Sequence, residues 1–374
     1  MTRIHIINFS RRFVYSSLFF FIPLHFITLG YSGWQIGVIV SLLAFAPLLF
    51  SFPTGWINDR ISIKRVIQGA LGLMILLFLA MGHVENFFAM AAIFLLVGVA
   101  NNALEISANS YYYKDDADTD LNRRFGMFNL WPSVGMALGA LLGGILTHIS
   151  NFQGMFYFFA VYLLGVLMVT GGIPRAALHA VSVHDYTLDL VNRKTILFSI
   201  LIFILALHWG AEGTVYTPFL QSMFHLNHLQ MALYIAIPLV FFCIASLWVV
   251  FIRFDPLLNE RIFLFAMVIS GAGHILMVSR SLAVSFLFRI IHEIGDGIMA
   301  AISFVFIFRL FEKRSIGGSS GMLVAIMTLG HMAGAILFSL IGYYMDLKYP
   351  FIISGILLIG DALFGRYLFS TQEY

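Results

Sequence analysis

The chain has 374 residues, of which 60% are hydrophobic and 10% are charged, and its formal net charge is +3 at pH 7. Soluble globular domains usually carry about 25% charged residues, so this composition excludes a soluble domain and indicates a protein that crosses a membrane several times. The small positive charge needs no nucleic-acid partner to explain it.

Long apolar runs follow one another along the whole chain. About 20 apolar residues in a helix span the hydrocarbon layer of a bilayer. The first run follows several arginines, but it has no small-residue cleavage site and leads straight into the next run, so it is expected to be a span and not a signal peptide. Twelve spans are predicted, near residues 12–30, 34–54, 66–83, 87–110, 126–148, 152–173, 195–220, 230–252, 262–279, 282–309, 318–342 and 350–369.

Lysine and arginine indicate the orientation of these spans. With the N-terminus in the cytoplasm, only Arg280 and Lys348 of the 21 basic residues fall outside and Arg289 falls within a span, which leaves 18 on the inner side. Cytoplasmic loops carry such an excess of basic residues. We therefore expect a multi-pass protein of the bacterial inner membrane with both termini in the cytoplasm.

The two halves of the chain share small residues at a fixed offset of 195 positions. Pro23 recurs as Pro218, and four residues of the fifth span recur in the eleventh: Gly126, Gly135, Gly139 and Ala140 return as Gly321, Gly330, Gly334 and Ala335. Internal repeats of this kind are typical of secondary transporters. The predicted organisation is an N-terminal six-helix bundle (1–174), a polar cytoplasmic linker (175–194) and a C-terminal six-helix bundle (195–374).

A short motif stands between the second and third spans. Gly55-Trp-Ile-Asn-Asp59-Arg60 is followed by Lys64 and Arg65. With the twelve spans and the repeat, this stretch resembles the loop signature of the major facilitator superfamily, although Ser62 and Ile63 stand where that signature has a second Gly and a basic residue. The resemblance implies the fold of that superfamily, with two six-helix bundles related by pseudo-two-fold symmetry, and a gating latch made by these residues. A simple topology anchor is the alternative interpretation.

Glycines of the fifth span are candidates for close helix packing, since small residues let helices approach. They are Gly126, Gly135, Gly139, Gly143 and Gly144. Their spacing also resembles the motif of the proton-antiport exporters in the superfamily, which favours efflux. Two departures from those exporters count against it, because Ala140 replaces a Pro and Phe94 replaces an Arg.

The tenth span holds four ionisable residues on one helical face, Arg289, His292, Glu293 and Asp296. Ionisable side chains inside a membrane are costly to insert and mark functional sites. We expect this face to line an aqueous cavity, with Arg289 able to pair with Glu293 and His292 with Asp296. The sequence does not decide whether Arg289 is free.

Two other spans add polar residues near the midplane. The seventh has His208 and Glu212 one turn apart, and the fourth has Asn101, Asn102 and Glu105 near one face. The predicted proton-coupling residues are Asp296, Glu212, Glu105, His292 and His208. The predicted substrate-binding residues are Arg289, Glu293, Asn101, Asn102, Trp131 and His331. In the alternative interpretation these pairs only neutralise one another.

The sequence thus predicts a secondary active transporter of a small organic solute, coupled to protons and working by alternating access, with efflux favoured. Import of a small nutrient, a sugar or an organic anion, by proton symport stays open, because Arg289-Ile-Ile-His292 resembles the tenth span of lactose-permease-like symporters. A divalent-metal exporter is a lesser alternative, since His208 and Glu212 are suitable ligand types. The histidines scattered over other spans show no common spacing and predict no metal site; they are His25, His83, His148, His274 and His331.

No phosphate-binding loop or catalytic constellation occurs, so no enzyme activity is expected. The proton gradient is the expected energy source, with no cofactor. The expected partners are a small-molecule substrate, protons and the lipid bilayer, and the protein is expected to act as a monomer.

Overall fold

The computed structural model describes residues 3–113, 121–173, 193–252, 255–310 and 316–370. In these ranges the chain is all-α, as predicted, with twelve α-helices and one short 3₁₀ helix. The helices of the first half are α1 (Arg3–Thr28), α2 (Gly33–Arg60), α3 (Ile63–Met81), α4 (Phe87–Tyr113), α5 (Leu121–Ile149) and α6 (Phe152–Val169), which continues into η1 (Thr170–Gly172). Those of the second half are α7 (Arg193–Phe224), α8 (His228–Phe251), α9 (Pro256–Leu276), α10 (Leu282–Leu310), α11 (Ile316–Tyr344) and α12 (Tyr349–Ser370).

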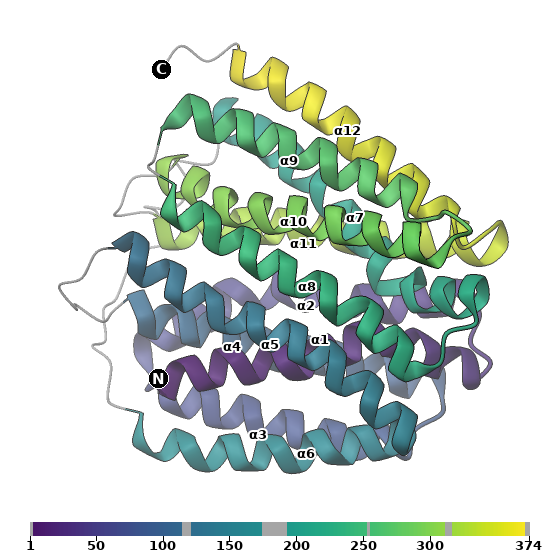
Figure 1. Cartoon of the computed structure of the whole chain (residues 1–374). Coiled ribbons are helices and arrows are strands. Elements are labelled where there is room, and N and C mark those ends of the chain that lie inside the picture. Colours follow the sequence, from purple (N-terminus) through teal and green to yellow (C-terminus); the bar gives the residue numbers. More distant parts are fainter. Residues whose placement is uncertain (1–2, 114–120, 174–192, 253–254, 311–315, 371–374) are drawn as a thin grey trace.

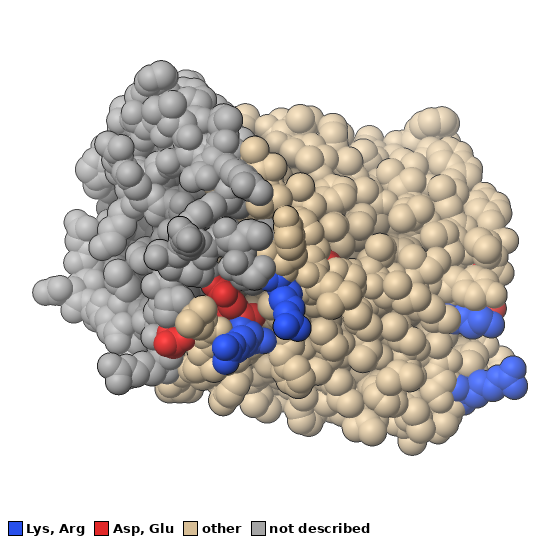
Figure 2. Space-filling view, turned by 90° about the horizontal axis from the view of Figure 1, so that it is seen from above, with Lys and Arg blue, Asp and Glu red and all other residues tan. Residues whose placement is uncertain are grey.

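Each predicted span coincides with one helix. Nine of the described helices are long and apolar enough to cross a membrane by length and composition, and α1, α9 and α10 are the three that are not among them. Helix α10 carries the four ionisable residues noted above. Figure 2 shows one face of the molecule, on which charged side chains gather toward two ends and the surface between them is almost free of charge. Such an uncharged band is suited to contact with lipid.

The first helix corrects one prediction. It begins at Arg3 and not near residue 12, so Arg11, which the charge count placed on the inner side and ahead of the first span, lies inside α1 and is buried. Arg11 has a partner inside the bundle, which is described below.

Glycines place two pairs of helices in close contact, one pair in each half. A side-chain carbon added at Gly139 of α5 would collide with the carbonyl oxygen of Phe13 in α1, and one added at Gly334 of α11 would collide with that of Leu207 in α7. Gly135 and Gly330 meet the carbonyls of Phe9 and Phe203 in the same way. The repeat in the sequence is therefore matched by a repeat in packing, α1 against α5 and α7 against α11.

Both chain ends lie on one side of the molecule, called here the terminal side (Figure 1). On the opposite side, α2 packs against α11 and α5 against α8, which joins the two halves. Gly33 and Gly37 of α2 lie against Tyr343 and Ser339 of α11. Gly144 of α5 lies against α8. These contacts need small residues, because any side chain there would push the halves apart.

Two further contacts between α1 and α7 join the halves deeper in the bundle. The hydroxyl of Thr217 donates a hydrogen bond to the carbonyl oxygen of Phe20 at 2.6 Å. Gly213 faces the ring of Phe19. The described contacts between the halves thus extend from the middle of the bundle to the side opposite the termini.

Candidate functional site

A cluster of ionisable side chains fills the space between α7, α9 and α10. No residue in it is more than 7% exposed. This group is called here the buried cluster, and its members are His208, Glu212, Ser270, His274, Arg289, His292, Glu293 and Asp296. The prediction that the four residues of α10 share one face is confirmed. The expectation that this face lines an open aqueous cavity is wrong, because the face packs against α7 and α9.

Arg289 is held on two sides by carboxylates. Its guanidinium donates to Glu212 of α7 and to Glu293 one turn along α10, which confirms the predicted pair with Glu293. The guanidinium carbon also lies 4.3 Å from the ring centroid of Tyr216, a cation–π distance. Arg289 is therefore paired and not free. A buried arginine is stable only with such partners, since an uncompensated charge in this environment is very costly.

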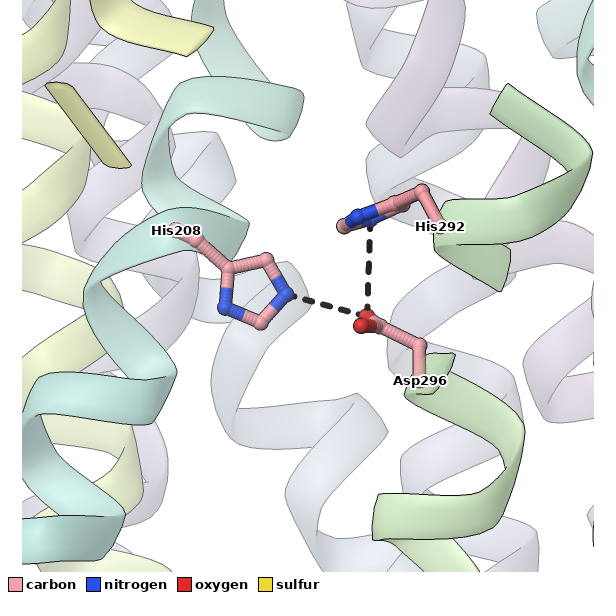
Figure 3. A group of neighbouring side chains, drawn as sticks. All are labelled: His208, His292 and Asp296. Carbon is pink, nitrogen blue, oxygen red and sulfur yellow. Dashed lines mark hydrogen bonds and ion pairs between the residues drawn. The ribbon is translucent and has the colours of Figure 1, made fainter. Parts of the chain in front are cut away.

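Asp296 lies between two histidines. One carboxylate oxygen, Oδ2, lies 2.9 Å from Nε2 of His208 and 3.7 Å from Nε2 of His292, so the predicted pairing of His292 with Asp296 is confirmed (Figure 3). The indole N–H of Trp209 is 3.3 Å from the same oxygen. The hydroxyl of Ser270 donates to the other oxygen, Oδ1, at 2.7 Å. Helix α7 thus supplies one histidine, and α10 supplies the other histidine and the carboxylate.

Glu212 lies between two other imidazoles. Its Oε1 is 3.0 Å from Nε2 of His292 and 3.2 Å from Nε2 of His274, and the two rings stack with centroids 3.8 Å apart. From the sequence, His274 is one of several scattered histidines. No signal within α9 marks it as part of the site, because its partners are 62 positions away in α7 and 15 or more away in α10.

The hydrogen-bond network assigns the same tautomer to all three histidines. Nδ1 of His208 contacts the carbonyl of Leu205, and Nδ1 of His292 lies 3.0 Å from the carbonyl of Ser270. Nδ1 of His274 lies 2.9 Å from the Ser354 hydroxyl, whose own hydrogen is directed to a backbone carbonyl. Since these oxygens accept, each Nδ1 carries the hydrogen. In the neutral form each Nε2 is then an unprotonated nitrogen that faces a carboxylate.

The charges of the buried cluster do not balance while the histidines are neutral. One arginine stands against three carboxylates, Glu212, Glu293 and Asp296, which leaves two negative charges. Burying an unbalanced charge is costly in the low-dielectric interior. The cluster is therefore suited to take up cations.

The first half holds a smaller ion pair. Arg11 of α1 donates to Glu105 of α4 at 2.9 Å and to the side-chain oxygen of Asn8 at 3.3 Å. The arginine side chain is 4% exposed and the glutamate side chain is 38% exposed. Glu105 thus lies in the first half of the molecule, whereas Asp296 and Glu212 lie in the second half. The pairing of Glu105 with Arg11 was not predicted from the sequence.

Four predicted substrate residues lie outside the buried cluster. Among the described residues, no hydrogen bond or ion pair links Asn101, Asn102, Trp131 or His331 to it. Asn102 accepts a hydrogen bond from Ser51 of α2 at 2.9 Å.

The other three occupy separate places. The side-chain oxygen of Asn101 is buried without a hydrogen-bond partner among the described residues. Trp131 lies 6.3 Å from the ring of His5. His331 of α11 lies 5.7 Å from Phe19 of α1, so it stands where the two halves meet. The structure therefore does not gather these residues into one group, and their roles stay predictions.

The predicted latch is described only in part. Gly55, Asp59 and Arg60 belong to α2, but their side chains, like the surroundings of Gly126 and the linker 175–192, lie outside the described residues. Lys64 donates to the carbonyl of Gly171 at 2.6 Å, within the first half, and Arg65 is exposed. The gating role of these residues stays a prediction.

Comparison with known proteins decides the family. The sequence model of the Major Facilitator Superfamily matches residues 4–259, more than half of the chain. The chain belongs to the Major Facilitator Superfamily. As a member of this superfamily it is a multi-pass membrane transporter of small molecules and not an enzyme, and its twelve helices adopt the superfamily fold.

Two curated relatives match over part of their length. The chain is 28% identical over 124 residues to multidrug resistance protein MdtG of Proteus mirabilis, which covers 33% of this chain and 31% of that protein. It is 27% identical over 135 residues to an uncharacterized transporter, C1039.04, of Schizosaccharomyces pombe, which covers 36% of this chain and 27% of that protein. The aligned stretch thus spans less than a third of either relative.

Solved structures of other superfamily transporters share the fold over the whole chain. The nucleoside transporter NupG superposes with a TM-score of 0.78 at 17% identity, covering 99% of both chains. A bacterial homologue of the human lysosomal transporter Spinster gives a TM-score of 0.81 at 12% identity, covering 100% of this chain and 97% of that one. The human organic anion transporter MFSD10 gives 0.74 at 15% identity, with 97% and 99% covered. At these identities the likeness shows the fold alone.

Proposed function

We propose that this transporter exports a small lipophilic or cationic organic solute in exchange for protons, across the bacterial inner membrane, by alternating access of its two halves. The observation that carries the coupling is the charge of the buried cluster. Three carboxylates surround one arginine between α7, α9 and α10, and three unprotonated histidine nitrogens face two of those carboxylates. Two protons would neutralise the cluster, and each could reside between an imidazole and a carboxylate.

The paired state of Arg289 supports a cationic or neutral solute. An anionic substrate would need a free guanidinium, and here both carboxylate partners and the Tyr216 ring occupy its surroundings. Charged groups recognise ligands of the opposite sign. A cluster with two more negative than positive charges repels anions and attracts cations, which disfavours the alternative of an organic-anion symporter.

Export is supported by similarity and by the packing of the fifth helix. The relative from Proteus mirabilis is called a multidrug resistance protein, and α5 carries the glycines whose spacing resembles that of proton-antiport exporters. Basic residues favour a cytoplasmic terminal side. The described contacts between α2 and α11, such as Gly33 with Tyr343, then lie toward the external side. A structure closed on that side is suited to receive a solute from the cytoplasm.

The remaining predicted roles fit the same cycle. The latch residues Asp59, Arg60, Lys64 and Arg65 would hold the terminal sides of the halves together in the outward-open state. His331 stands at the contact between the halves, where a solute moving through the centre would pass. The protein is proposed to act as a monomer, with the proton gradient as its energy source.

The test uses proteoliposomes that hold the purified full chain and a pH-sensitive dye. Lipophilic organic cations, with ethidium among them, are added outside while the membrane voltage is clamped. We expect the lumen to become alkaline, because each cation that enters drives protons out. Protein-free liposomes and the Asp346→Asn variant, which changes a carboxylate in the α11–α12 connection, serve as controls. Acidification on addition of a solute, or no pH change with any cation that the protein carries, would overturn the proposal.

A further inference from the structure

We propose that His208, His292 and Asp296 form a binding site for one divalent transition-metal ion of the zinc class. The inference deepens the proposed function, on which it rests for the cation-binding role of the buried cluster. The three side chains come from α7 and α10 and converge on one point, as Figure 3 shows. Their ligand atoms all lie within 4.8 Å of one another.

The distances between these atoms fit a small metal ion. Oδ2 of Asp296 is 2.9 Å from Nε2 of His208 and 3.7 Å from Nε2 of His292. Tetrahedral zinc binds nitrogen and oxygen ligands at about 2.0–2.1 Å, which places neighbouring ligands about 3.3–3.4 Å apart. The observed distances lie on either side of this value, so an ion needs only small side-chain movements to bind.

The histidine tautomers present the correct atoms. Nδ1 of His208 and of His292 donate to the backbone carbonyls of Leu205 and Ser270. The Nε2 lone pair of His208 then faces Asp296, and that of His292 lies between Asp296 at 3.7 Å and Glu212 at 3.0 Å. Two unprotonated nitrogens beside a carboxylate oxygen repel it unless a cation lies between them. Metal-binding histidines usually donate the other ring N–H to a carbonyl or carboxylate, and this contact orients the ring.

A second layer of contacts orients the carboxylate as well. The Ser270 hydroxyl donates to Oδ1 of Asp296 at 2.7 Å and lies 2.9 Å from Nδ1 of His292. One serine thus positions two of the three ligands. Ser270 itself is fully buried, so water does not compete for these contacts.

A neighbouring group of potential ligands is a poorer site. Glu212, His274 and His292 also lie within ligand distance of one another. Arg289, however, donates to Glu212 and also lies 3.5 Å from Nε2 of His274, so its positive charge opposes a metal ion there. The His208 site has no such direct contact with Arg289 among the described residues. One divalent ion at this site would also balance the two negative charges of the buried cluster.

The ligand types select the metal. Imidazole nitrogens suit zinc, cobalt and related ions, whereas magnesium and calcium require oxygen ligands. Three protein ligands leave a fourth tetrahedral position open, as in zinc sites whose bound water exchanges. An exchangeable ion at this point is compatible with a transporter whose cluster must be loaded and emptied in each cycle.

The test titrates cobalt(II) into the purified full chain in detergent at neutral pH and records visible absorption. Tetrahedral cobalt gives intense visible bands, and we expect them to saturate at one ion per chain. Zinc should abolish the bands, and magnesium should leave them unchanged. His208→Ala and Asp296→Asn should abolish them, and Ser270→Ala should weaken binding by about 10–100-fold. His25→Ala, which removes a partly buried histidine of α1 far from the cluster in sequence, is the matched control.

Each variant is first passed over a size-exclusion column, and variants that do not elute as folded protein are replaced by His208→Gln and Asp296→Ser. Absence of the cobalt bands in wild type would overturn the proposal. Bands that persist in the folded His208 and Asp296 variants, or that His25→Ala weakens equally, would overturn it too. The measurement needs no transport, so its failure is distinguishable from a failure of proton exchange in proteoliposomes.

Discussion

The two halves of the molecule share their packing but differ in their chemistry. In the first half α5 lies on α1 through Gly135 and Gly139, and in the second half α11 lies on α7 through Gly330 and Gly334, with backbone carbonyls as the contact in every case. The second half buries eight interacting polar side chains between α7, α9 and α10. Among the described residues of the first half, the one arginine–glutamate ion pair is that of Arg11 with Glu105.

This difference separates two requirements of a transporter. Both halves need the same close helix contacts, because each must move as a rigid body during alternating access. In the proposed function, only the second half supplies the cation-binding chemistry. If helix packing and cation binding are separate requirements, variants of the two halves should differ in how much stability they lose.

The largest effect is expected at Arg289. Arg289→Met leaves the carboxylates of Glu212 and Glu293 buried without a positive partner, so we expect the free energy of unfolding to fall by about 3–5 kcal/mol. Thermal unfolding of the purified protein in detergent measures this loss. Arg289→Met combined with Glu212→Gln and Glu293→Gln should recover much of it, because the charge of the buried cluster with neutral histidines then changes from −3 to −1. A triple variant as unstable as Arg289→Met would contradict the account.

An intermediate effect is expected at the repeated glycines. Gly139→Ala and Gly334→Ala each place a carbon against a backbone carbonyl oxygen, so both should lower the free energy of unfolding by a similar amount, about 1–3 kcal/mol. Gly165→Ala in α6, where the added carbon meets no atom within 4 Å, is the matched control and should be neutral or slightly stabilising. Thermal unfolding of the purified variants in detergent measures these losses. A large loss in one half with none in the other would show that the repeat in packing has no energetic counterpart.

A smaller effect is expected at the ion pair of the first half. Glu105 is 38% exposed, so solvent screens its interaction with Arg11, and Glu105→Gln should cost about 1 kcal/mol or less. The informative quantity is the difference between this loss of unfolding free energy and the loss caused by Arg289→Met. Equal losses at the two sites would mean that the first half contains a buried charge centre as demanding as the second.

The smallest effect is expected outside the bundle, at Asp346. The backbone N–H of Lys348 donates to this carboxylate at 2.9 Å, and this contact holds the pKa of Asp346 below its ordinary value. A lowered pKa in the folded state contributes stability above the ordinary pKa, and that contribution disappears as pH falls through the folded value. The melting temperature of Asp346→Asn should therefore lie slightly below that of wild type at neutral pH. The difference should vanish in acid, and a difference that grows as pH falls would have the wrong sign.

Much of the fold could be predicted from the sequence, because apolar runs and basic loops report directly on spans and their order. Each of the twelve predicted spans overlaps one helix, although α1 begins earlier than expected, at Arg3. Arg289 with Glu293 and His292 with Asp296 could be paired from helical spacing alone. The sequence did not predict the roles of Arg11 and His274. Both depend on partners in other helices, and no periodicity within one helix reports such a contact.

The enclosed character of the site also depends on tertiary structure. A polar helical face indicates that the face is not exposed to lipid, but it does not tell a water-filled cavity from a packed polar network. In this protein α7 and α9 supply enough partners, among them Glu212 and Ser270, to exclude the cavity at that face. The expectation of an aqueous cavity was wrong for this reason.

The central claim, that cation coupling resides in the second half, is tested most directly by comparing two variants in one assay. Proteoliposomes with a trapped pH dye receive a transported organic cation, with wild type, Asp296→Asn or Glu105→Gln in the membrane. We expect alkalinisation of the lumen with wild type and with Glu105→Gln, and none with Asp296→Asn although its labelled solute still equilibrates. A normal pH response with Asp296→Asn, together with its loss in Glu105→Gln, would contradict the account and place coupling in the first half.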